Sequence, residues 1–113
     1  MPEITVTLPV PPLVNRYWRR AGTHTYLSPA GRAYKQTVAE IMDAKPLKGN
    51  VAISATIYRA RKAGDLDNYA KGLLDAMVGL AYEDDKQVTN LHMVRRDDKT
   101  NPRCEVRVWS VTE

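Results

Sequence analysis

The sequence predicts an α+β fold, a small mixed β-sheet covered by two main helices, in the order β-α-β-α-β-β. Four segments alternate apolar and polar residues as strands do, and two longer segments repeat apolar residues at helical spacing. The chain of 113 residues is long enough for one hydrophobic core and too short for two. We therefore expect a single domain over residues 1–113.

The first half of the chain contains one predicted strand and one predicted helix. Apolar side chains alternate with threonines over residues 4–8, and a proline-rich segment then ends this strand. Residues 13–27 are predicted to form an ordered loop. Ser28 and Pro29 are typical of a helix N-cap and first turn, and the apolar spacing after them predicts a helix over 29–44.

The second half of the chain contains the remaining elements. Alternating residues over 51–57 predict a second strand, and helical spacing predicts a second helix over 66–80 with one apolar face. Two further strands are predicted over 88–95 and 104–111. The polar segment 97–102 between them has the composition of a hairpin loop.

Positive charge is in excess and is clustered along the chain. The net charge is +4 with an isoelectric point near 9.3, and basic residues gather at 16–20, 59–62 and 95–103. Such clusters suit a polyanion, because each neutralised phosphate releases condensed counterions. The simpler alternative is that Lys and Arg only solvate a small surface.

Composition also excludes some classes of protein. No apolar run approaches the roughly 18 residues that a membrane span needs, and the N-terminus lacks a signal-peptide pattern. The single cysteine, Cys104, cannot form an internal disulfide. We therefore expect a cytoplasmic protein that does not associate with a membrane.

A group of carboxylates is the candidate reactive centre. Asp65 and Asp67 are two residues apart at a predicted strand-to-helix junction, where an extended backbone can point both side chains the same way. Lys71 follows Asp67 by one helical turn, about 6 Å along the axis. Asp84 and Asp85 lie in the turn after the helix, and this turn can approach the first pair if the helix packs on the sheet.

This pattern indicates metal-dependent phosphodiester hydrolysis. Ionised carboxylates bind hard cations such as Mg²⁺, and a bound metal removes the repulsion between clustered acids and between acids and DNA phosphate. The metal also lowers the pKa of a bound water, which then supplies a hydroxide nucleophile. On this interpretation Asp65 and Asp67 hold the metal, joined by Asp84 or Asp85 if the turn approaches them. Lys71 then stabilises charge that develops on the phosphate oxygens or orients the attacking water.

Each of these residues also has a simpler interpretation. An Asp at the start of a helix often caps it, which would explain Asp65 or Asp67 alone. Asp67 and Lys71 can form an ordinary i,i+4 ion pair, and Asp84 and Asp85 can be solvated turn residues. From the residues alone, a metal-dependent nuclease and a non-catalytic basic DNA-binding module both remain open.

Three ordered motifs, however, span nearly the whole chain. They are Leu8-Pro9-Val10-Pro11-Pro12 followed by Asn15-Arg16-Tyr17, then Asp65-Leu66-Asp67-Asn68 with Lys71 and Asp75-Ala76, then Asp84-Asp85-Lys86-Gln87-Val88. With these motifs and spacings the chain resembles the RusA-type Holliday junction resolvases, small endodeoxyribonucleases often encoded by phages and prophages.

The resemblance implies a homodimer that binds four-way DNA junctions and makes paired symmetric nicks with Mg²⁺, or with Mn²⁺ as a substitute. A two-fold dimer would present two sites for two symmetric cuts. The resemblance assigns metal binding and catalysis to Asp65, Asp67 and Asp85. It adds Lys71 as the catalytic lysine and Asp84 as a further metal contributor.

The resemblance and the basic clusters together place the DNA contacts. These are expected at Asn15, Arg16, Arg19, Arg20, Arg61, Lys62 and Asn68. One position departs from the family pattern: a basic residue often precedes the first Asp, and here that residue is Gly64. The alternative activity is a metal-dependent nuclease that acts on other branched or single-stranded DNA.

Overall fold

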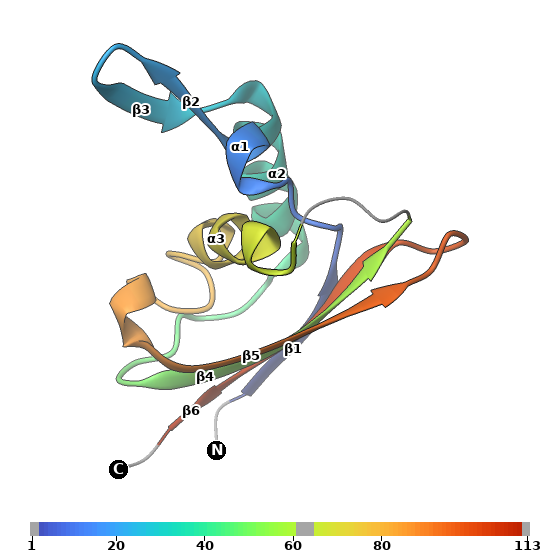
Figure 1. Ribbon diagram of the computed structural model, residues 1–113. Helices are drawn as coiled ribbons and strands as arrows, with labels where there is room; N and C mark the ends of the chain where they lie inside the picture. The colour runs from blue at the N-terminus through green and yellow to red at the C-terminus, as the bar shows by residue number, and fades with distance from the viewer. Residues whose placement is uncertain (1–2, 61–64, 112–113) are drawn as a thin grey trace.

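The computed structural model describes residues 3–60 and 65–111 of the chain. Within these ranges the fold is α+β, with a mixed sheet and the helices on one of its faces (Figure 1). The elements in chain order are β1 (Glu3–Leu8), α1 (Val14–Tyr17), β2 (Trp18–Ala21), β3 (His24–Leu27), α2 (Pro29–Ile41), β4 (Val51–Arg59), α3 (Asp67–Ala76), the short 3₁₀-helix η1 (Asp85–Gln87), β5 (Val88–Asp97) and β6 (Arg103–Ser110). None of the helices in these ranges is long and apolar enough to cross a membrane.

The four-stranded sheet has the order β1-β6-β4-β5. Strand β6 pairs antiparallel with both β1 and β4, whereas β4 and β5 are parallel. Parallel neighbours need a crossover connection, and α3 lies within that connection. The predicted hairpin around 97–102 is therefore wrong, because β4 lies between β5 and β6 and the two strands do not pair with each other.

The hydrophobic core lies between the sheet and the helices. Strand β4 is central, and its alternating residues Val51, Ile53 and Ile57 are fully buried. Val38 of α2 and Leu73 of α3 belong to the same buried cluster. The apolar face predicted for each of the two main helices is thus the face that covers the sheet.

Both main helices start close to their predicted first residues and end earlier than predicted. The N-cap of α2 is confirmed, since the backbone N–H of Gly31 donates a 3.0 Å hydrogen bond to the Ser28 hydroxyl. Helix α2 ends at Ile41 because the next residue has extended backbone angles. Helix α3 ends at Ala76, and the chain then turns through Gly79, whose φ of 83° favours glycine.

The sequence predicts an ordered loop over residues 13–27, but this segment contains regular secondary structure. It forms α1 and the two-stranded sheet β2–β3, an antiparallel hairpin that projects from the rest of the molecule (Figure 1). Gly22, with φ of 64°, lies in its turn. The predicted element order therefore lacks α1, β2, β3 and η1.

Tyr17 anchors the base of this hairpin. It is fully buried, and its carbonyl oxygen accepts hydrogen bonds from the backbone N–H and the hydroxyl of Ser28, at 2.9 and 3.1 Å. Glycines on two helices make room for it: a Cβ on Gly72 would lie 3.0 Å from the Tyr17 ring, and one on Gly31 would meet the Tyr17 carbonyl. The hairpin is thus attached to the body of the domain through α2 and α3.

Candidate active site

The first pair of candidate carboxylates lies at the start of α3. Asp67 is the first residue of this helix and Asp65 precedes it, and both side chains are exposed. The N-cap is Leu66, and no side chain caps the helix. Among the described residues neither carboxylate has a hydrogen bond or an ion pair, and Asp67 does not pair with Lys71. The capping and ion-pair interpretations therefore do not explain these residues.

The second pair of carboxylates lies in the turn before β5, where Asp84 has a structural role. Its Oδ1 accepts a 2.9 Å hydrogen bond from the backbone N–H of Lys86. This hydrogen bond, together with the charge of Lys86, holds the pKa of Asp84 below its usual range. Asp84 thus caps η1 and stays ionised, and Asp85 projects as the exposed acid beside it.

Gln87 fixes this turn, a role that sequence reasoning missed. Its Oε1 accepts hydrogen bonds from the backbone N–H groups of Glu83 and Asp84, at 2.8 and 3.0 Å. Its Nε2 donates to the carbonyl oxygens of Leu47 and Gly49, at 2.9 and 2.7 Å. The spacing Asp84-x-x-Gln87 is a capping-box pattern and could have identified this role from the sequence.

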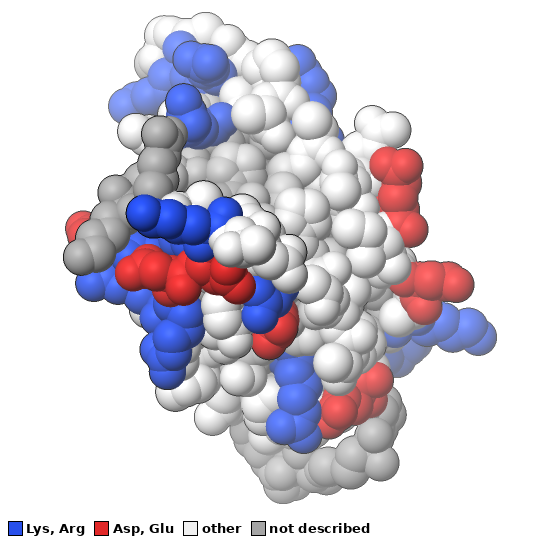
Figure 2. Space-filling view, turned by 90° about the vertical axis from the view of Figure 1, so that its right-hand side faces the viewer, with Lys and Arg blue, Asp and Glu red and all other residues white. Residues whose placement is uncertain are grey.

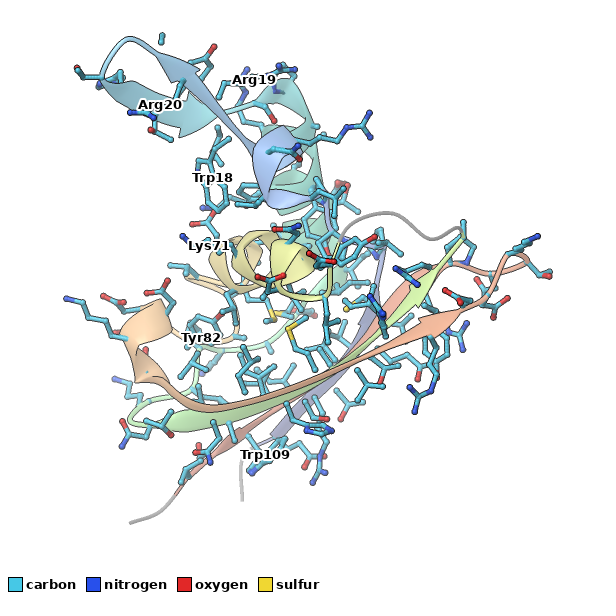
Figure 3. All side chains as sticks on the ribbon, viewed as in Figure 1. Trp18, Arg19, Arg20, Lys71, Tyr82 and Trp109 are labelled. Carbon is cyan, nitrogen blue, oxygen red and sulfur yellow. The ribbon has the colours of Figure 1, made fainter. Side chains whose placement is uncertain are left out.

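A groove of about 840 Å³ connects Lys71 with Asp85. Its lining includes Trp18 and Arg20 from the hairpin, and Lys71 and Leu74 from α3. Figure 3 shows Trp18 beneath the hairpin, on the same side of the molecule as Lys71. The candidate catalytic lysine and the third candidate acid thus share one open surface that the basic hairpin borders.

Within the part of the chain that the structure describes, the three predicted metal ligands do not form one group. Asp65 and Asp67 are not part of the groove lining that contains Asp85. Over residues 3–60 and 65–111, no group of three or more His, Cys, Asp or Glu side chains is close enough to hold a metal ion. Metal binding by Asp65, Asp67 and Asp85 therefore stays a prediction.

The predicted DNA-contacting residues of the N-terminal half lie together on α1 and β2. Asn15, Arg16, Arg19 and Arg20 are all exposed. Successive side chains of a strand point to opposite faces, and the lining of two grooves reflects this alternation. Arg20 lines the 840 Å³ groove, and Arg19 lines a second groove of about 560 Å³. The hairpin therefore presents positive charge on both of its sides.

Of the remaining predicted DNA contacts, the structure describes Asn68. Asn68 is half-buried in the first turn of α3, and Arg61 and Lys62 fall outside the described residues. Figure 2 shows acidic side chains in the middle of one face of the molecule, with Lys and Arg above and below them. This face is the right-hand side of Figure 1, where the loop between β5 and β6 lies.

Comparisons with known proteins identify the family of this chain. The family model described as Endodeoxyribonuclease RusA matches residues 9–109. The crossover junction endodeoxyribonuclease rusA of Enterobacteria phage HK97 is 34% identical over 102 residues, 84% of each chain. The protein of that name from Enterobacteria phage 82 is 32% identical over 109 residues, 91% of each chain. The one from Escherichia coli K12 is 32% identical over 114 residues, 96% of this chain and 95% of the relative.

These matches, which cover the hairpin, α3 and the turn at η1, define an endodeoxyribonuclease. The chain belongs to the RusA endodeoxyribonuclease family.

Proposed function

We propose that this endonuclease resolves four-way (Holliday) DNA junctions by paired symmetric nicks, in the service of recombination and repair. The observation that carries the proposal is the position of Lys71, which lies one helical turn from the exposed carboxylate of Asp67 and lines the groove beside the Arg-rich hairpin. The relatives from phage HK97 and Escherichia coli are named crossover junction endodeoxyribonucleases, which supports a branched substrate. Two symmetric cuts need two sites, so we propose a homodimer as the active form.

The donor chemistry suits a hard divalent cation. Asp65, Asp67 and Asp85 offer only exposed carboxylate oxygens, the ligands that Mg²⁺ and Mn²⁺ prefer. We propose that these three residues hold Mg²⁺, with Asp84 as a further contributor. When bound, the metal supplies Lewis acidity and a water of lowered pKa. Over residues 3–60 and 65–111 the three acids do not form one group, so this proposal requires that they approach one another when metal and DNA bind.

The protein's own residues have two tasks in this proposal. Arg16, Arg19 and Arg20 neutralise backbone phosphates and position the junction arms, with Asn15, Asn68, Arg61 and Lys62 as further contacts. Lys71 lines the groove, where its ammonium group would stabilise the negative charge that develops on the phosphate during attack. Phosphate contacts of this kind give affinity and register, and the junction's shape supplies selectivity.

A cleavage assay tests this function. The purified protein is incubated with a labelled four-way junction, a linear duplex of the same sequence, a replication fork and a single strand, each with Mg²⁺ or EDTA. We expect symmetric, Mg²⁺-dependent nicks in the junction and no cleavage of the linear duplex. Cleavage of the fork or the single strand alone would favour a nuclease for other branched or single-stranded DNA. Binding without cleavage in Mg²⁺ or Mn²⁺ would favour a non-catalytic binding module.

A further inference from the structure

We propose that the groove between the β2–β3 hairpin and α3 binds one unpaired nucleotide of the branched substrate, with its base stacked on Trp18. Arg20 and Lys71 would pair with the phosphate of this nucleotide. The inference rests on the proposed function only in that the substrate is branched DNA. The contacts of Trp18, the charges around it and the size of the groove carry the argument.

Trp18 is held in place at the base of the hairpin. It is the first residue of β2 and pairs with Leu27 across the hairpin. Its ring lies against that of Tyr17, with centroids 4.3 Å apart and planes inclined by 54°. Tyr17 is itself fully buried, so the contact fixes the position of the indole, which remains half-exposed and lines the groove. A fixed aromatic ring can stack a base with little loss of side-chain entropy.

The charges along the groove favour a nucleotide phosphate. Arg20 and Lys71 are cationic, and Asp75 and Asp85 are anionic. The carboxylate of Asp75 is already engaged, because it accepts a 2.7 Å hydrogen bond from the Tyr17 hydroxyl and lies 3.6 Å from the Lys35 ammonium. Among the described residues that line the groove, two cations therefore remain against one free carboxylate, that of Asp85. Lys71 is also the candidate catalytic lysine, so a phosphate that binds to Arg20 and Lys71 would be in direct contact with it.

The size and lining of the groove indicate an unpaired nucleotide and not a duplex. Its volume of about 840 Å³ is in the range of sites that enclose one small molecule, on the order of 300–1,000 Å³. Val14, Trp18 and Leu74 give it an apolar part that a phosphate alone would not use. In a stacked duplex both faces of each base are covered, so a base can reach the indole only where the stack is interrupted, as at a branch point, and an unpaired base fits the narrow groove best.

Tryptophan fluorescence can test this contact without changing Trp18. The chain has two tryptophans, and Trp109 lies on β6 near Arg107, away from the groove (Figure 3). The Trp109→Phe variant leaves Trp18 as the only tryptophan. We expect a four-way junction added in EDTA to quench its fluorescence, and the same junction with abasic branch-point nucleotides to bind with much less quenching. The matched Trp18→Phe variant should show no quenching.

Binding measurements give a second, independent readout. Stacking of one base is worth about 5- to 150-fold in affinity, so Trp18→Ala should weaken junction binding by a factor in this range. Trp18→Tyr should restore most of the affinity. The abasic junction should bind wild type and Trp18→Ala equally well, and the affinity for linear duplex should be the same in both.

Two outcomes would overturn the inference. One is equal quenching of Trp18 by the intact and the abasic junction. The other is an equal loss of affinity for junction and duplex in Trp18→Ala. Cleavage by the Trp109→Phe variant in Mg²⁺ separates this inference from the proposed function. If the junction is cut but does not quench Trp18, the nucleotide site is refuted and the proposed function stands. If the junction is neither bound nor cut, both the nucleotide site and the proposed function are refuted.

Discussion

The Tyr17 hydroxyl donates a 2.7 Å hydrogen bond to Oδ2 of Asp75, which joins the base of the hairpin to α3. Lys35 of α2 lies 3.6 Å from the same carboxylate, so three helices meet at one acid. Burial, together with the hydrogen bond to Asp75 and its charge, raises the pKa of Tyr17, which keeps the phenol protonated as a donor. Asp75 lies one helical turn beyond Lys71, so this link sets the spacing between the basic hairpin and the candidate catalytic lysine.

Removal of this hydroxyl should therefore loosen the hairpin. We expect Tyr17→Phe to lower the free energy of unfolding by about 1–2 kcal/mol, at the lower end of values for hydrogen bonds to charged groups, because Asp75 is partly open to water. Urea denaturation followed by circular dichroism measures this change. Tyr26→Phe, on the exposed part of the hairpin, is the matched control and should be close to neutral. Equal stabilities for the two variants would contradict this role of Tyr17.

The loop between β5 and β6 should make stability depend on pH. The backbone N–H of Asn101 and the guanidinium of Arg103 donate to Asp98, at 3.1 and 2.9 Å, and these contacts lower the pKa of Asp98 from its usual 3.8. A carboxyl with a lowered pKa in the folded state stabilises the fold at higher pH, and this contribution is lost as the pH falls through the folded pKa.

The Asp98→Asn variant isolates this contribution. The difference in unfolding free energy between wild type and Asp98→Asn should be constant above about pH 5 and should shrink as the pH falls below about 4. Urea denaturation at a series of pH values measures the difference. A gap that stayed the same down to pH 3 would show that the contacts of Asp98 do not stabilise its charged form.

Lys71 should act on the cleavage step more than on binding. We expect Lys71→Met to slow junction cleavage by about 10²–10³-fold, the effect of removing one group that stabilises charge in a transition state. Affinity for the junction should fall only slightly, since many basic residues share the phosphate contacts. Single-turnover cleavage and gel-shift binding separate the two effects. Lys45→Met, an exposed lysine after α2, is the control. Parallel losses in binding and cleavage would assign Lys71 to phosphate binding alone.

Segments with strong periodicity were predictable from the sequence, and the hairpin was not. Strand β4 and helix α2 bury alternating or helically spaced apolar residues, which is the pattern that sequence reasoning detects. In β2, Arg19, Arg20 and Ala21 are all exposed, so no alternation marks the strand. Tyr17 and the two glycines packed around it anchor the hairpin, and these contacts come from segments far apart in the chain.

The sheet neighbours of the last two strands could also not be predicted from local sequence patterns. Their proximity in sequence suggested a hairpin, but β4 is the most buried strand and takes the position between them. At the candidate site, spacing alone placed Lys71 one turn from Asp67. The common groove of Lys71 and Asp85 depends on how α3, η1 and the hairpin pack, and so does the position of Trp18. These relationships could not be predicted without the three-dimensional structure.

The central claim is that carboxylates at the start of α3 support metal-dependent cleavage of a DNA junction. The most direct test is the Asp67→Asn variant, which keeps the size of the side chain and removes its charge. Junction binding and the Mg²⁺-dependent cleavage rate are measured side by side, with Asp43→Asn, an exposed acid beyond α2, as the control. We predict that Asp67→Asn binds the junction as tightly as wild type and no longer cuts it. Cleavage at the wild-type rate would contradict the assignment.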